Sequence, residues 1–340
     1  MRVGILTGGG DCPGLNPAIR AIVRRGLKEP GTEVVGIRQG WKGLVDGDYI
    51  PLDRSVVSGL LIRGGTMLGS TPSSIFDKDV ELKKLLDGYR KVVLDALIVI
   101  GGDSTLSVAS RMCDAGLNVI GIPKTIDNDI LGTDRTIGFN TAVTVAVEAI
   151  DRVHTTAESH NRVMIVEVMG RNAGWIAVVS GIAGGADLIL VPERPFDIEE
   201  VCEAIRKRHQ IRNFTIVVVA EGAHEKGGGV QTNADEKDAF GYSTIGGVGN
   251  WLKREIRNRL GFDTRTVVLG HTQRGGTPTV DDRILATRFG VKALESVLEG
   301  RFSVMVALRN DEIVVVPLRE AVKNRRVDDY WHSLADIFSG

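Results

Sequence analysis

Two polar stretches of the chain hold residue types suited to phosphate chemistry, and each follows an apolar run. They are Gly-Gly-Asp-Ser-Thr at 101–105 and Lys-Thr-Ile-Asp-Asn-Asp at 124–129. Paired glycines let backbone N–H groups approach a phosphate, and a helix start adds its dipole. Asp103 is a hard oxygen ligand for Mg²⁺, and Lys124 adds a positive charge.

The second stretch also offers a general base for a substrate hydroxyl, either Asp127 or Asp129. An anion cradle, a metal ligand, a cation and a base are together the parts that phosphoryl transfer needs. Each stretch alone is equally compatible with an ordinary tight turn or a capped loop. The interpretation therefore depends on finding both in one unit of structure.

A strand–helix–strand unit must position these two stretches. The apolar run 96–100 predicts a strand covered on both faces, and 119–122 predicts the next strand. Between them, Asp103 or Ser104 is placed to cap an amphipathic helix. In such a unit both turns lie at the carboxyl edge of a parallel sheet, where open α/β folds bind ligands.

A further glycine-rich turn, Gly-Gly-Gly-Asp-Cys-Pro-Gly at 8–14, separates a short strand from a helix near the N-terminus. It lacks the final Gly-Lys-Ser/Thr of a Walker A loop, so it is not one. Together with the turn at 101–102 it suggests a ligand that spans two adjacent turns. Cys12 in this turn is either a reactive thiol or a small filler residue.

Strands alternate with helices along the whole chain, so the predicted class is α/β with mainly parallel sheets. Helical spacing predicts a helix over 54–65, and the polar, glycine-rich stretch 226–241 predicts a mobile loop. Charged residues at strand ends of the second half suit an anionic substrate group, because guanidinium binds phosphate bidentately. These residues are Arg162, Arg171, Glu221, Arg265, His271 and Arg274.

The composition argues against several classes of protein. The chain has 340 residues and a formal net charge of −1, so it lacks a broad basic surface for nucleic acid. No apolar run approaches the roughly 18 residues of a membrane span, and no signal peptide precedes the first strand. Three cysteines, Cys12, Cys113 and Cys202, have no paired or metal-like spacing, which predicts a reduced, cytoplasmic protein.

The same stretches resemble the signatures of the phosphofructokinase family. In that family's order they are Thr-Gly-Gly-Gly-Asp-Cys-Pro-Gly-Leu-Asn, Gly-Gly-Asp, Pro-Lys-Thr-Ile-Asp-Asn-Asp, Val-Glu-Val-Met-Gly-Arg, Ala-Glu-Gly-Ala and Leu-Gly-His-Thr-Gln-Arg-Gly-Gly. The likeness runs from residue 1 to about 320. It is greatest to the bacterial branch that contains both ATP- and pyrophosphate-dependent members.

The resemblance implies two Rossmann-like three-layer domains with mainly parallel sheets and an active site in the cleft between them. Residues 1–138 plus about 273–322 would bind the phosphoryl donor, and 139–272 plus the tail at about 323–340 would bind fructose 6-phosphate. The implied reaction is the glycolytic, Mg²⁺-dependent transfer from ATP to the sugar 1-hydroxyl. The implied assembly is a homodimer or homotetramer, with no nucleic-acid or membrane partner.

The resemblance also implies a role for each site residue. Asp127 would be the base, with Lys124 beside it, and Asp103 would hold Mg²⁺. The donor would be bound by Gly9, Gly102 and Ser104. The sugar phosphate would be bound by Thr125, Met169, Gly170, Arg171, Glu221, His271 and Arg274, with Arg162 and Arg265 reaching in from a neighbouring subunit.

Two departures from the family pattern bear on activity and donor. Pro72 stands where many relatives carry an arginine that spans donor and acceptor phosphates. Position 104, usually Gly in ATP users and Asp in pyrophosphate users, is Ser104, whereas Lys124 resembles the pyrophosphate pattern. Ser104 places no negative charge against a nucleotide α-phosphate, so ATP is the expected main donor and pyrophosphate the alternative.

Two other functions share part of this pattern. NAD kinases share the Gly-Gly-Asp turn but lack the Thr-Ile-Asp-Asn-Asp and His-Thr-Gln-Arg-Gly-Gly loops. A regulatory paralogue that senses phosphosugars without catalysis is supported by Pro72 alone, since Asp103 and Asp127 are both present.

Overall fold

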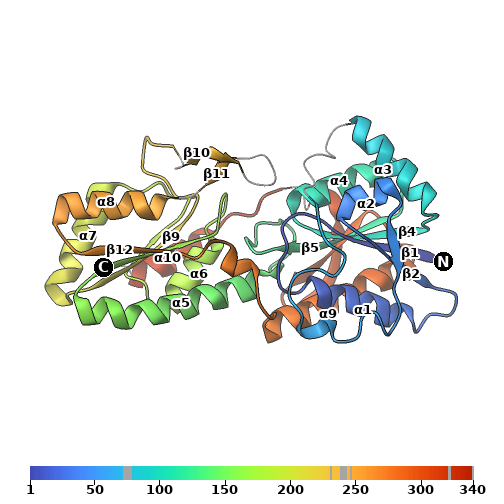
Figure 1. Cartoon of the computed structure of the whole chain (residues 1–340), viewed down its shortest axis with the longest axis horizontal. Coiled ribbons are helices and arrows are strands. Elements are labelled where there is room, and N and C mark those ends of the chain that lie inside the picture. The colour runs from blue at the N-terminus through green and yellow to red at the C-terminus, as the bar shows by residue number, and fades with distance from the viewer. Residues whose placement is uncertain (72–78, 230–231, 238–242, 246, 321–322, 339–340) are drawn as a thin grey trace. The chain divides into compact units, whose positions relative to one another are not determined.

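A computed structural model gives the fold of the chain (Figure 1). It describes residues 1–71, 79–229, 232–237, 243–245, 247–320 and 323–338, so Pro72 lies outside the described residues. The chain divides into two compact units. Unit 1 consists of Met1–Thr141 and Arg274–Asn324, and unit 2 consists of Ala142–Gln273 and Arg325–Gly340.

Unit 1 contains a sheet with the strand order β14-β13-β5-β4-β1-β2-β3, and β6 pairs with β5. The strands are β1 (Arg2–Thr7), β2 (Glu33–Ile37), β3 (Tyr49–Pro51), β4 (Ala96–Gly101), β5 (Val119–Thr125), β6 (Ile137–Gly138), β13 (Val304–Arg309) and β14 (Glu312–Pro317). Among these strands, pairing is parallel except where β3 and β14 join their neighbours. The apolar run of β4 is wholly buried, as expected for a parallel strand covered on both faces.

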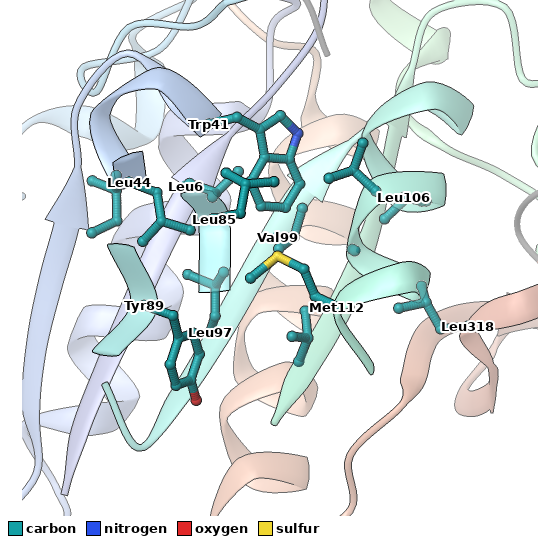
Figure 2. Packing of buried hydrophobic residues seen from close by; sticks show 14 of the residues in the cluster. Leu6, Trp41, Leu44, Leu85, Tyr89, Leu97, Val99, Leu106, Met112 and Leu318 are labelled. Carbon is teal, nitrogen blue, oxygen red and sulfur yellow. The ribbon is translucent and has the colours of Figure 1, made fainter. Parts of the chain in front are cut away.

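Helices cover both faces of the unit 1 sheet. On one face lie α2 (Gly40–Asp46), α3 (Asp79–Lys91) and α4 (Asp103–Asp114), and on the other lie α1 (Leu15–Gly26) and α9 (Val280–Leu298). Under the first face, Trp41, Leu85, Leu106 and Met112 pack around Val99 of β4 (Figure 2). This buried cluster holds β4 and β5 in place, and the two polar turns extend from their carboxyl ends.

Unit 2 contains a parallel sheet with the order β12-β7-β9-β8. Its strands are β7 (Val163–Val168), β8 (Leu188–Leu190), β9 (Thr215–Ala220) and β12 (Thr264–Val268). One face is covered by α7 (Ile198–Ile211) and α8 (Val248–Leu260), and the other by α5 (Phe139–His160), α6 (Trp175–Ala183) and α10 (Asp329–Phe338). Both units thus have helices on two faces of a mainly parallel sheet, which confirms the predicted fold class.

Three local predictions were wrong. The range 54–65 contains only the 3-10 turn η1 (Leu60–Ile62), because Gly59 adopts a left-handed conformation with φ 77°. The range 226–241 contains β10 (Thr232–Lys237), whose partner β11 (Ser243–Ile245) comes later in the chain. The N-cap of α4 is Gly102, without a side-chain cap, rather than Asp103 or Ser104.

No helix among the described residues is both long enough and apolar enough to cross a membrane.

Candidate active site

Lys124, at the end of β5, holds the glycine-rich turn between β1 and α1. Its side chain is buried, with 3% of the residue exposed, and its Nζ donates to the carbonyl of Gly8 at 3.0 Å and to that of Gly10. Burial lowers the pKa of Lys124, and the nearby guanidinium of Arg274 lowers it further. Gly9 between these carbonyls has φ 74°, a conformation that favours glycine. A cation therefore lies directly against the turn expected to bind the donor.

Arg274 brings a second cation to the same turn. Its Nη1 donates to the carbonyl of Asp11 at 3.3 Å. A Cβ on Gly10 would lie 2.7 Å from that Nη1, so the glycine makes room for the guanidinium. The structure places Arg274 in unit 1, against the turn expected to bind the donor, and its predicted contact with the sugar phosphate stays a prediction. Two cations beside one glycine turn suit a polyphosphate.

The turn between β4 and α4 presents a helix N-terminus. Gly102 is the N-cap of this 12-residue helix, and Asp103 and Ser104, its first two residues, are both exposed. Asp103 Oδ1 accepts the N–H of Ser104 at 2.6 Å. The helix start attracts anions through its free N–H groups and its dipole, and Ser104 adds no charge that would oppose them.

Asp103 fits a Mg²⁺ ion shared with phosphate. Among the described residues its Oδ2 makes no hydrogen bond or ion pair, and no group of three or more His, Cys, Asp or Glu side chains forms a metal cage there. Mg²⁺ is usually held by one or two carboxylates, with waters and substrate phosphate oxygens as the other ligands. An exposed carboxylate at the start of α4 meets that requirement.

Asp127 and Asp129 follow β5 and are both half-buried. Burial is the main reason that the pKa of each carboxyl group is raised, and repulsion from Asp127 and Asp103 helps to raise that of Asp129 to about 7. Arg274 and Lys124 oppose the rise at Asp127. Asp127 Oδ1 is buried and has no hydrogen-bond partner among the described residues. Such an oxygen is an acceptor available to a substrate hydroxyl.

Asn128 shapes this turn, a role that was not predicted from the sequence. Its φ is 51°, in the left-handed region that asparagine tolerates better than most residues. Its buried side chain accepts the N–H of Thr136 at 3.0 Å and donates to the Asp134 carbonyl at 3.3 Å. Thr125 Oγ1 accepts the N–H of Asp127 at 3.2 Å. The only sequence signal was an asparagine between two aspartates in a polar turn.

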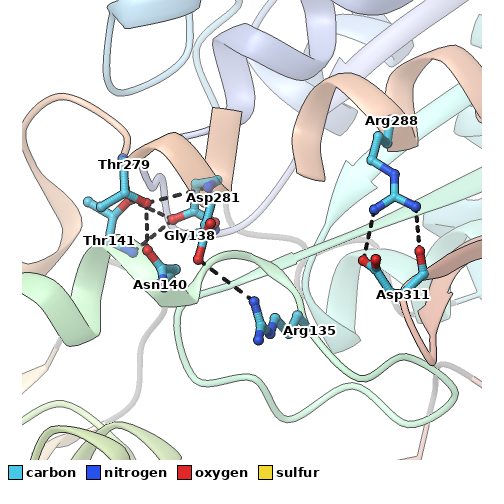
Figure 3. Close-up of polar contacts among 9 residues, drawn as sticks. Arg135, Gly138, Asn140, Thr141, Thr279, Asp281, Arg288 and Asp311 are labelled. Atoms are coloured by element: carbon cyan, nitrogen blue, oxygen red, sulfur yellow. Dashed lines mark hydrogen bonds and ion pairs between the residues drawn. The ribbon is translucent and has the colours of Figure 1, made fainter. Parts of the chain in front are cut away.

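Behind the glycine-rich turn, the start of α5 is anchored to α9. The buried Asp282 accepts the N–H groups of Gly138 and Thr141 at 2.9 and 2.8 Å. Figure 3 shows Thr141 and Thr279 gathered at the same point. Asp282 therefore fixes the chain segment that follows the Asp127 turn.

Cys12 packs against this anchored segment. It is fully buried, its Sγ donates to the carbonyl of Ile137 at 3.4 Å, and a Cβ on Gly138 would lie 2.4 Å from that sulfur. Burial raises the pKa of Cys12 to about 12. The residue is therefore a filler and not a reactive thiol.

Unit 2 brings four of the predicted residues together at the carboxyl edge of its sheet: Met169, Gly170, Arg171 and Glu221. The parallel pairing of β7 with β9 places the two turns next to each other. Gly222 donates its N–H to the Gly170 carbonyl at 3.1 Å, and a Cβ on Gly222 would lie 2.0 Å from the Arg171 carbonyl. Only glycine permits this close backbone approach.

Gln273 supports the first of these turns, a role that was not predicted from the sequence. Its side chain is fully buried, and its Oε1 accepts the N–H of Met169 at 2.9 Å. Its Nε2 has no hydrogen-bond partner among the described residues. His271, two residues earlier in η3 (Gly270–Arg274), is exposed. The only signal was the position of Gln273 inside the His-Thr-Gln-Arg-Gly-Gly motif.

Arg162 and Arg265 lie at the opposite, amino edge of the unit 2 sheet. Arg162 directly precedes β7, and Arg265 is the second residue of β12. A strand rises about 3.3 Å per residue, so β7 separates Arg162 from Met169 by roughly 20 Å. Within one chain, these two arginines do not join the turns of Met169 and Glu221.

Comparisons with known proteins agree on one family. The family model described as Phosphofructokinase matches residues 2–297. The chain is 53% identical, over the full length of both, to a pyrophosphate–fructose 6-phosphate 1-phosphotransferase of Amycolatopsis methanolica. It is 51% identical, over 95% of each chain, to ATP-dependent 6-phosphofructokinase 3 of Streptomyces coelicolor.

Solved structures give the same result. Phosphofructokinase from Saccharomyces cerevisiae matches with a TM-score of 0.81 and 33% identity, over 99% of this chain and 46% of that one. A pyrophosphate-dependent phosphofructokinase from Nitrosospira multiformis has a TM-score of 0.85 at 19% identity, over 100% of this chain and 92% of that one, a likeness of fold. Together with the motifs, these matches show that the chain belongs to the phosphofructokinase family.

Proposed function

We propose that the chain transfers a phosphoryl group from ATP to the 1-hydroxyl of fructose 6-phosphate and forms fructose 1,6-bisphosphate. The observation that most supports this is the buried Oδ1 of Asp127, an acceptor without a partner among the described residues. It belongs to the same unit as two glycine turns and two cations. Phosphoryl transfer depends on positioning, charge stabilisation and a base, and these residues supply each of them.

On the donor side, the backbone N–H of Gly102 and the start of α4 would bind phosphate oxygens. Gly9, whose own N–H donates to the Thr71 carbonyl at 3.2 Å, would let the donor approach its turn closely. Lys124 and Arg274 would balance their negative charge. Mg²⁺ held by Asp103 would neutralise the charge that develops on the transferred group. Asp127 would accept the proton of the sugar 1-hydroxyl. The hydroxyl oxygen would form a bond to the terminal phosphorus of ATP, and the bond between that phosphorus and the leaving phosphate would break.

On the acceptor side, the proposal assigns fructose 6-phosphate to the turns that follow β7 and β9, together with Thr125, His271 and Arg274. Arg162 and Arg265 would act from a neighbouring subunit, because they lie at the other edge of their own sheet. Such a shared site requires a homodimer or a homotetramer. A cytoplasmic location fits the three free cysteines.

Pyrophosphate is the second candidate donor, and the observation that favours it is Lys124. A buried ammonium hydrogen-bonded to Gly8 and Gly10 places positive charge where a compact inorganic donor would need it. Relatives at 53% and 51% identity carry the two different donor names, so overall similarity does not separate the donors.

Steady-state rates with fructose 6-phosphate, measured against ATP and pyrophosphate in parallel, test the proposal. We expect kcat/KM to be higher with ATP, and chelation by EDTA to abolish turnover until Mg²⁺ is restored. A strong preference for pyrophosphate would reassign the donor. Failure to form fructose 1,6-bisphosphate with either donor would favour the regulatory paralogue.

A further inference from the structure

Asp263 lies between Arg162 and Arg265, the two arginines at the amino edge of the unit 2 sheet. Its Oδ2 accepts from Arg162 Nε at 2.7 Å, and its Oδ1 lies 2.5 Å from Arg265 Nη1. Each carboxylate oxygen therefore binds one guanidinium. Charge-assisted contacts of this length are among the stronger hydrogen bonds in proteins.

The backbone of the sheet fixes the carboxylate next to Arg162. β12 pairs in parallel with β7 from Thr264 and Val163 onward. The N–H of Val163 donates to the Asp263 carbonyl at 3.0 Å. Asp263 and Arg162 thus directly precede paired residues on neighbouring strands, so their contact is set by strand register and not by chance meeting of flexible side chains.

The contact leaves donors free on both arginines. Asp263 uses only Nε of Arg162, and Nη1 of Arg265 has one more acceptor, the Thr264 carbonyl at 3.4 Å. Within the described residues, the other N–H groups of the two guanidiniums make no hydrogen bond. The side chains of Arg162 and Arg265 are 25% and 45% exposed, so a ligand can reach them.

The positive charges of Arg162 and Arg265 explain why a carboxylate between them is useful. Two guanidiniums alone would repel each other, whereas Asp263 attracts both and leaves a net positive charge for an anion. The hydrogen bond from Arg162 holds the pKa of Asp263 below its usual value, and Arg265 and Arg257 act in the same direction. Asp263 therefore stays ionised at neutral pH.

We propose that Asp263 is a positioning residue for the sugar-phosphate site: it holds Arg162 and Arg265 together so that both bind the 6-phosphate of fructose 6-phosphate in the neighbouring subunit. The inference rests on the proposed function. Ordering long, flexible side chains before the ligand arrives reduces the entropy lost on binding. The residue acts through the arginines and does not itself touch the substrate.

The test compares Asp263→Asn with a matched control in steady-state kinetics. Asp263→Asn keeps the size of the side chain and removes its charge, so KM for fructose 6-phosphate should rise about tenfold while kcat changes less than about twofold. Asp263→Glu retains a carboxylate and should recover part of the affinity. The control is Asp336→Asn, since Asp336 pairs with Arg194 at 3.0 Å in the same unit, and it should change neither constant.

An Arg162→Ala background shows whether Asp263 acts through the arginine. There, Asp263→Asn should raise KM by less than about threefold. The inference is overturned if Asp263→Asn alone leaves KM unchanged or lowers it. It is also overturned if Asp263→Asn raises KM by the full tenfold in the Arg162→Ala background. If the wild-type protein had no transferase activity, the proposed function would be refuted. If Arg162→Ala had a normal KM, the shared site would be refuted. In either case the inference about Asp263 would also be refuted.

Discussion

Asp127 combines a buried oxygen that lacks a partner among the described residues with a pKa raised by burial. A carboxylate with these properties can accept a proton from a substrate hydroxyl, so its removal should slow the reaction. We expect Asp127→Ser to lower kcat by about 10²–10⁴-fold with little change in KM, measured with saturating donor. Asp129→Asn serves as the control and should retain far more activity, because Asp127 Oδ1, and no oxygen of Asp129, is among the buried side-chain atoms without a partner in the part of the chain that the structure describes. Near wild-type turnover in Asp127→Ser would refute the assignment.

Asp129 also makes the stability of the fold depend on pH. Its pKa is about 7 in the folded protein against an ordinary 3.8, so the folded state binds the proton more tightly than the unfolded state. This group stabilises the fold fully below its unfolded pKa, and the contribution is lost as pH rises through about 7. The melting temperature of Asp129→Asn should therefore exceed that of wild type by more at pH 8 than at pH 5. An equal difference at both pH values would contradict this reading.

At the scale of secondary-structure elements, the first turn of α4 determines the charge that would lie next to the phosphates of a bound donor. Ser104 is exposed in the first turn of that helix, where an aspartate would repel a nucleotide α-phosphate. Ser104→Asp should cut kcat/KM for ATP more than tenfold and should affect pyrophosphate much less. Ser104→Asn has the same size as the aspartate without its charge, and ATP use should survive in it. Undiminished ATP use by Ser104→Asp would show that charge at this position does not select the donor.

The unit 2 sheet divides its predicted residues between two edges. Met169 and Glu221 follow the carboxyl ends of β7 and β9, whereas Arg162 and Arg265 stand at the amino ends of β7 and β12. Strand length alone keeps these groups apart in one chain. An active site that uses all four must therefore draw on more than one subunit.

At the scale of the whole molecule, subunit mixing tests this shared site. Arg162→Ala and Asp127→Ser protein, dissociated, mixed and reassembled, should recover activity, because some sites then combine an intact Asp127 with an intact Arg162 of the neighbour. For a dimer, random mixing restores about a quarter of the sites. Each variant reassembled with itself is the control. Verified mixed oligomers without recovered activity would mean that each site is built within a single subunit.

Contiguous patterns in the sequence were enough for the fold class, the β4–α4–β5 unit and the family. Buried parallel strands are short apolar runs, and phosphate-binding turns are runs of glycine and polar residues, so both are visible without any knowledge of the fold. The residue types of the candidate site, from Asp103 to Arg274, could be named from the sequence for the same reason, and their roles stay predictions. The helix expected over 54–65 shows where such patterns mislead, since helical spacing does not reveal the left-handed Gly59.

Only the tertiary structure decided which side chains act on one another. Lys124 binds a carbonyl 116 positions away, and Gln273 supports the N–H of Met169 across 104 positions. The place of Asp263 between Arg162 and Arg265, and the burial that makes Cys12 inert, were equally invisible in the sequence. These contacts follow from strand order and register, which bring distant segments together and have no local sequence signature.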